Sequence, residues 1–182
     1  PFAHAAGPSS LVGVALGQPM IIQLLREWPP GYGGVERVAH ELALVWGGAV
    51  YSLDAQPQRR LEPDPLPVSY ARMRLPRLTV GRLLVPLFSR QLLTLLMSSH
   101  PLHGHLPSPG VLALLLLARM LRPRRRVTAH WHCFLEPSPG FSGRLFAVYQ
   151  WLALLMLPCL SAVITTSPLL AVELERCGCR PE

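Results

Sequence analysis

Four histidines lie at alternate positions in two short segments, each at the end of a predicted strand. His103 and His105 flank a glycine, and His130 and His132 flank a tryptophan. Alternate residues of a strand point to the same side, so we expect each pair of imidazoles to share a face of the sheet. Imidazole donates and accepts protons near neutral pH and also binds metals. Because no carboxylate lies nearby to complete a metal site, the pattern favours substrate contact or packing, and we expect no metal.

A second candidate site is the glycine pair Gly33-Gly34, which separates an apolar run from a helical pattern that begins at Val35. Glycines let the oxyanions of a ligand approach backbone N–H groups, and a helix N-terminus adds about half a positive charge. The spacing is neither that of a GxGxxG dinucleotide fingerprint nor that of a Walker loop. Alone, such a pair is more often simple turn chemistry. The histidine-bearing strands that follow it strengthen the functional interpretation.

The elements that position these residues alternate between strands and helices. Short apolar or β-rich segments predict strands over residues 20–25, 49–53, 100–106, 126–132 and 161–166, and an imperfect apolar–polar alternation predicts another over residues 68–75. Helical periodicity predicts helices over residues 35–45, 79–97, 111–121, 145–157 and 168–177, with Ser108 and Ser142 as N-caps. This alternation predicts an α/β fold, a Rossmann-like, doubly wound parallel sheet with helices on both faces. Right-handed crossovers then place every loop that follows a strand at one edge, where ligands bind.

The charge balance narrows the choice of partners. The chain has 182 residues and a net charge of +7, and all of its basic residues are arginines. The aromatic residues do not interleave with the arginines as a base-stacking surface requires, so we expect no nucleic-acid partner. The net positive charge is also compatible with attraction to phosphate groups or to an anionic membrane surface. The four cysteines lack metal-ligand spacing and are interpreted as reduced thiols of a cytosolic protein.

Residues 145–164 carry no formal charge and are long enough to span a bilayer. Gln150, the break at Pro158 and the strand-like segment 162–166 argue against a span. These features favour a buried helix, or one that lies at a membrane interface.

In this order, the segments resemble the N-terminal half of the GT-B glycosyltransferases of family 4. Leu24–Ala43 is similar to the opening strand, GlyGly loop and first helix of that family. His103–Pro107 resembles its HxHxP strand end, and Val127–His132 resembles its VxTxH strand. Ile164–Pro168 is similar to its strand-to-helix junction.

The resemblance implies retaining transfer of a hexose from a nucleotide-sugar to a glycan or lipid-linked acceptor. The nucleotide-sugar is a co-substrate, and neither a metal nor another cofactor is implied. Gly33 and Gly34 would contact the diphosphate, and His132 would be the catalytic residue beside the transferred sugar and the acceptor. The remaining residues implied to bind substrate are His105, His130 and Glu36.

In the family, the groups that hold the donor belong to the C-terminal half. We therefore expect residues 20–182 to form the acceptor-side domain alone, inactive by itself and part of a longer chain. Residues 1–19 are interpreted as a disordered or non-native leader before a natural start at Met20. The resemblance suggests cell-envelope polysaccharide synthesis in the cytoplasm, at the inner face of the plasma membrane. The alternatives are a non-catalytic binding module and a small membrane-associated protein.

Overall fold

The computed structural model describes residues 20–27, 33–53, 68–81, 83–136 and 139–179. The first elements in chain order are β1 (Ile22–Leu25), α1 (Gly34–Trp46), β2 (Ala49–Ser52), β3 (Ala71–Arg74), β4 (Arg77–Val80), β5 (Leu83–Pro86) and α2 (Arg90–Met97). They are followed by β6 (Leu102–Leu106), α3 (Pro109–Leu121), β7 (Val127–Trp131), α4 (Phe141–Met156), the 3-10 turn η1 (Leu157–Cys159), β8 (Ala162–Thr165) and α5 (Pro168–Arg176).

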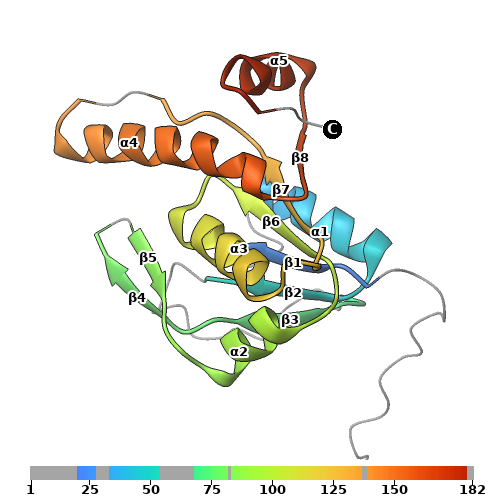
Figure 1. Ribbon diagram of the computed structural model, residues 1–182. Coiled ribbons are helices and arrows are strands. Elements are labelled where there is room, and N and C mark those ends of the chain that lie inside the picture. The colour runs from blue at the N-terminus through green and yellow to red at the C-terminus, as the bar shows by residue number, and fades with distance from the viewer. Residues whose placement is uncertain (1–19, 28–32, 54–67, 82, 137–138, 180–182) are drawn as a thin grey trace, which may run out of the picture.

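Six strands form one parallel sheet in the order β3-β2-β1-β6-β7-β8. This is the strand order of a Rossmann-type sheet, and it confirms the predicted doubly wound α/β fold. Helix α1 covers one face, and α2 and α3 cover the other (Figure 1). The direction of winding reverses between β1 and β6, which are neighbours in the sheet. Ligands of such folds bind beside this point, at the carboxyl edge of the strands.

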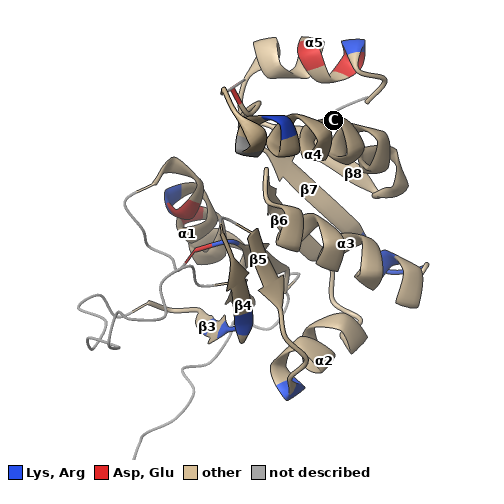
Figure 2. Ribbon diagram, turned by 90° about the vertical axis from the view of Figure 1, so that its left-hand side faces the viewer, with Lys and Arg blue, Asp and Glu red and all other residues tan. Residues whose placement is uncertain are grey.

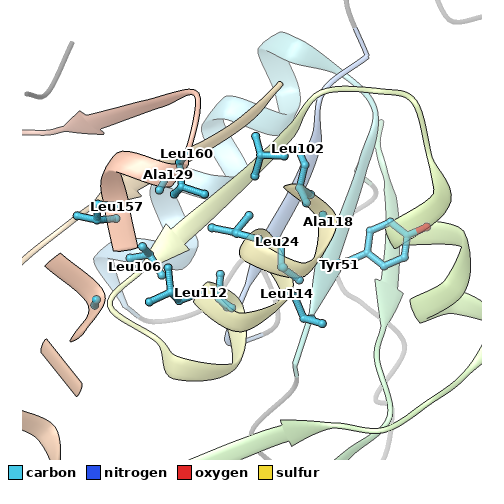
Figure 3. Close-up of a cluster of buried hydrophobic side chains, with 14 of the residues drawn as sticks. Leu24, Tyr51, Leu102, Leu106, Leu112, Leu114, Ala118, Ala129, Leu157 and Leu160 are labelled. Atoms are coloured by element: carbon cyan, nitrogen blue, oxygen red, sulfur yellow. The ribbon is translucent and has the colours of Figure 1, made fainter. Parts of the chain in front are cut away.

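The two faces of the central strands differ in chemistry. On the α3 face, the strands contribute apolar side chains such as Leu24, Leu102 and Ala129 to the main core, where they meet residues of α3 (Figure 3). On the α1 face the apolar cluster is smaller. The same face receives the polar side chains of the central strands, which are Gln23, His103, His105, Thr128 and His130. The period of two in each strand therefore separates the packing residues from the polar ones.

Close packing holds β6 against α3 at Gly104. A Cβ added at this residue would lie 2.5 Å from Cδ1 of Leu115, whose side chain is fully buried. We predict that Gly104→Val lowers the free energy of unfolding by about 3 kcal/mol, because neither the strand nor Leu115 has room to move. Urea denaturation measures this loss. Gly34→Ala is the control, since its added Cβ meets no atom within 4 Å, and equal stability of the two variants would contradict the packing argument.

The predicted helix over residues 79–97 is wrong. The segment begins with β4 and β5, an antiparallel hairpin, and only its second half is helical, as α2. Gly81 turns the hairpin with a φ of 59°, and β-branched residues such as Val80 and Val85 favour extended backbone. The many leucines of the segment gave a helical pattern that hid this turn.

The predicted caps are only partly right. Ser108 is the N-cap of α3, although its side chain makes no capping hydrogen bond. Ser142 is not a cap, because α4 already begins at Phe141 after Gly140, which has a φ of 91°. The proposed leader of residues 1–19 and the loop of residues 54–66 lie outside the described residues.

Residues 145–164 do not form one continuous helix. They contain most of α4, then η1 at the Pro158 break, and then β8. Within the ranges that the structure describes, no helix has the length and apolar character needed to cross a bilayer. Arginines lie on several separate elements, including α1, α2, α4 and α5 (Figure 2). All four cysteines are free thiols.

Candidate functional site

The four histidines predicted from the sequence converge on the α1 face of the sheet. β6 and β7 pair so that His103 lies opposite Thr128 and His105 lies opposite His130. The ring centroids of His103 and His105 are 5.1 Å apart, and those of His130 and His132 are stacked at 4.1 Å. Three of the imidazoles are buried, whereas His132, which follows β7, is partly exposed. The sequence predicted two pairs, and the sheet register joins them into one cluster.

A chain of hydrogen bonds runs through this cluster from α1 to its partly exposed end. Nδ1 of His105 lies 2.9 Å from Nε2 of His132. The other nitrogen of His105, Nε2, lies 2.9 Å from Oε1 of Gln23. Gln23 in turn donates its Nε2 hydrogen to the backbone carbonyl of Ala39 in α1, at 3.1 Å. Gln23 is completely buried, and sequence analysis missed it, although a single glutamine within an apolar strand was a usable signal.

The imidazoles of His103 and His130 lie next to each other, and each has a ring nitrogen without a hydrogen-bond partner among the described residues. Nδ1 of His103 hydrogen-bonds to Oγ1 of Thr128 at 2.8 Å, and Trp46 of α1 packs edge-on against the ring. Among the described residues, neither Nε2 of His103 nor Nε2 of His130 has a hydrogen-bond partner. Ligand atoms of His103, His105 and His130 all lie within 4.8 Å of one another. Both nitrogens of His105 are hydrogen-bonded, so within this group of described residues only His103 and His130 keep an unpartnered nitrogen.

Burial keeps the cluster neutral. Loss of solvation, followed by repulsion from neighbouring imidazoles, lowers the pKa of His103 to about 3 and that of His132 to about 4. The same causes lower the pKa of His105 well below its ordinary value, and burial lowers the pKa of His130. At neutral pH all four imidazoles are therefore uncharged, and each carries one hydrogen-bond donor and one acceptor.

This neutrality predicts that the fold loses stability in acid. A histidine whose pKa is lower in the folded state takes up a proton on unfolding, so the free energy of unfolding falls as the pH drops below 6.5. At about 1.4 kcal/mol per pKa unit, protonation of His132 in the unfolded state lowers the free energy of unfolding by ~3 kcal/mol between pH 6.5 and pH 4. Urea denaturation between pH 4 and 7.5 measures the slope. His103→Gln should flatten it, whereas the exposed Leu93→Gln, which removes no titratable group, should not. A flat profile for the parent chain would refute the assignment.

The glycine pair lies at the start of α1. Gly33 is the N-cap in extended conformation, and Gly34 is the first helical residue, exposed and with open space around its α-carbon. Glu36 is buried in the first turn, and its carboxylate packs back over Gly33. The unpaired amides of the helix N-terminus favour a negative group at this position. The sequence-predicted residues Gly33, Gly34 and Glu36 thus share one turn, whose helix N-terminus favours a negative group and where the carboxylate of Glu36 lies.

The turn and the histidine cluster lie at the same edge of the sheet. Gly33 follows β1 and His132 follows β7, with β6 between them. Two strand spacings separate these strands, or about 10 Å. A hollow of about 460 Å³ lined by Ser99 and by Arg122–Arg125 lies at the opposite edge, before β6 and β7. That hollow is therefore separate from the site.

Residues 32–182 match the family model described as Glycosyltransferase Family 4. The match covers most of the chain, including the glycine turn, all four clustered histidines and every strand after β1. Among curated proteins, none matches the chain significantly.

Proposed function

Since the chain belongs to glycosyltransferase family 4, we propose that its described domain is the acceptor-side, N-terminal half of a GT-B enzyme. The proposed reaction is retaining transfer of a hexose from a nucleotide-sugar to a glycan or lipid-linked acceptor. The observation that carries this proposal is the meeting of the glycine turn and the histidine cluster at the switch point of the sheet. The groups that hold the ribose and the sugar of the donor would belong to a second domain.

In this proposal, the donor diphosphate lies at the N-terminus of α1. Gly34 leaves its backbone open to approach, and the helix dipole offsets part of the negative charge of the leaving group. The carboxylate of Glu36 occupies the same turn in the structure. It moves aside for the diphosphate and accepts a hydrogen bond from a substrate hydroxyl.

His132 is the residue that we place beside the transferred sugar and the acceptor. It is the one member of the cluster that combines a neutral ring with exposure. A neutral imidazole binds a hydroxyl group without opposing the positive charge that develops on a sugar ring as its bond to the diphosphate breaks. His105 and His130 support it from within the sheet. We propose that no resident metal takes part, because His105 is committed to other hydrogen bonds.

The test is nucleotide-sugar binding and transfer by the natural full-length protein. Titration calorimetry with UDP-glucose, GDP-mannose and ADP-glucose, followed by transfer assays on lipid extracts, should identify one donor that is bound and consumed. Transfer should survive EDTA. NMR of the product should show the anomeric configuration of the donor. A protein that binds none of these donors and hydrolyses none of them would be a binding module instead.

We further propose that α4 rests on an anionic membrane surface that presents the acceptor. The helix exposes apolar side chains at helical spacing, with basic Arg144 among them: Phe141, Leu145, Val148, Leu152 and Leu155. An apolar stripe beside a basic residue is typical of helices that lie in the plane of a bilayer interface. The proposal places the protein in the cytoplasm, peripheral to the inner face of the plasma membrane, in cell-envelope polysaccharide synthesis.

Leu152→Glu is predicted to weaken binding to phosphatidylglycerol vesicles at least tenfold, because burial of a leucine side chain contributes about 1.5–3 kcal/mol. Vesicle co-sedimentation measures the partition coefficient. The matched control is Leu93→Glu on α2, since the two leucines are 43% and 47% exposed. An equal loss in both variants would remove α4 as the membrane contact.

A further inference from the structure

We propose that Gln23 and His105 are positioning residues that hold His132 in a single tautomer. In this tautomer Nε2 of His132 carries the proton and Nδ1 is unprotonated. The role of this tautomer in sugar transfer rests on the proposed function, whereas the tautomer itself is independent of any activity. The tautomer follows from three hydrogen bonds taken in order, starting at a group that can only accept a hydrogen bond.

The fixed group is the backbone carbonyl of Ala39, which can only accept a hydrogen bond. The side-chain atom of Gln23 that approaches it, at 3.1 Å, must therefore be the amide nitrogen. This places the amide oxygen of Gln23 toward His105, 2.9 Å from its Nε2. The opposite orientation would set two oxygens against each other in a site that excludes water, because Gln23 is completely buried.

The amide oxygen of Gln23 is also an acceptor, so Nε2 of His105 carries the proton. A neutral imidazole has one N–H, which leaves Nδ1 of His105 as an acceptor. Burial disfavours a second proton on this ring and holds its pKa well below the ordinary value. The direction of the next hydrogen bond is therefore fixed as well.

Nε2 of His132 lies 2.9 Å from Nδ1 of His105 and must donate to it. In the neutral ring, Nδ1 of His132 then keeps its lone pair. The groups that bear on His132 are His130, stacked on its ring at 4.1 Å, and His105, with His103 behind it. All of them are imidazoles whose pKa is lowered, so none supplies a charge that would reverse the assignment.

The consequence is that the free ring nitrogen of His132 has a fixed hydrogen-bonding role. His132 presents an acceptor and no donor, so it selects a ligand group that has a hydrogen to give, such as a sugar or acceptor hydroxyl. The opposite tautomer would present an N–H and favour a carbonyl or phosphate oxygen instead. In metal sites, removal of the hydrogen-bond partner that orients a ligating histidine costs about 10–100-fold in activity, and we expect a comparable loss here. Gln23 acts through two intervening bonds and does not contact the substrate.

The experiment compares Gln23→Leu, Gln23→Glu and Thr128→Val in the natural full-length protein labelled with ¹⁵N-histidine. The imidazole ¹⁵N shifts report which nitrogen of each ring is protonated, and the signals of His132 are those lost in His132→Gln. The parent protein should show Nε2–H at His132, and so should Gln23→Glu at a pH high enough to keep His105 neutral, because the new carboxylate still accepts from Nε2 of His105. Gln23→Leu should show a mixture of tautomers. Thr128→Val is the matched control, because Thr128 binds His103 and lies outside the chain of bonds.

In transfer assays, Gln23→Leu should lower kcat about 10–100-fold with little change in KM. Gln23→Glu should retain activity at high pH and move the acid limb of the pH profile upward by about one unit, because its carboxylate stabilises a protonated imidazole. Thr128→Val should match the parent protein.

The spectra and the kinetics separate the possible failures. Nδ1–H at His132 in the parent protein, or an unchanged tautomer in Gln23→Leu, would overturn the inference whatever the activity. Altered tautomers with unaltered kcat and an unaltered pH profile would overturn the positioning role. A parent protein that transfers no sugar would refute the proposed function, whereas the spectra would still decide the tautomer.

Discussion

Replacement of His132 by alanine is expected to lower kcat about 100-fold, a typical loss when a residue that manages protons at a reacting group is removed. His132 is the partly exposed end of the buried imidazole cluster, and it alone brings a neutral ring nitrogen to the carboxyl edge. Transfer is measured with the donor and acceptor that the full-length protein uses.

The free energy of unfolding of His132→Ala should change by only about 1 kcal/mol, because the truncation removes one hydrogen bond at a partly exposed position. Urea denaturation separates this small loss from the kinetic one. His100→Ala is the control, since that histidine is exposed before β6, at the opposite edge. Parent-like turnover in His132→Ala would move the chemistry to another residue.

The second large effect is expected at the glycine turn. Gly34→Val should reduce kcat/KM at least 100-fold, the usual loss when one donor to a developing oxyanion is removed. The valine side chain would cover the backbone N–H groups at the start of α1. The fold should tolerate it, because an added Cβ at Gly34 has no atom within 4 Å.

Circular dichroism and the melting temperature of Gly34→Val should stay close to those of the parent, while binding of the nucleoside diphosphate should be lost in calorimetry. Ala147→Val serves as the control, as it places the same side chain on an exposed face of α4. If Gly34→Val bound the nucleoside diphosphate normally, the diphosphate would have to lie away from α1.

Much of the fold was open to prediction because several strands of the sheet are short, largely apolar segments bounded by turn residues. The alternation of strands and helices was sufficient to predict a doubly wound sheet. The hairpin of β4 and β5 was missed because leucines are compatible with a helical pattern and with a strand. The chain reverses at Gly81, with a φ of 59°, and a single glycine within a leucine-rich segment does not reveal its backbone angle.

The sequence predicted the two histidine pairs of the site but not the hydrogen bonds that join them. Period-two spacing placed His103 with His105 on one face, and the ends of the strands placed the pairs at one edge. The contact between His105 and His132 depends on the register of β6 against β7, which no local pattern encodes. Gln23 acquires its role only because Ala39 of α1 lies over β1. Such a partner cannot be identified before the helix is docked.

The separation of the two sheet faces has a consequence for how this domain can change. The leucine-rich layer between the sheet and α3 supplies most of the burial, whereas the imidazoles lie on the other side of the same strands. Substitutions at alternate positions of β1, β6 and β7 therefore alter either the apolar core or the hydrogen-bonded polar cluster, but not both at once. A combinatorial library restricted to the α1 side of these strands would vary the imidazole cluster while the α3 side stays constant. Related proteins could change the polar cluster by the same route and keep the apolar core.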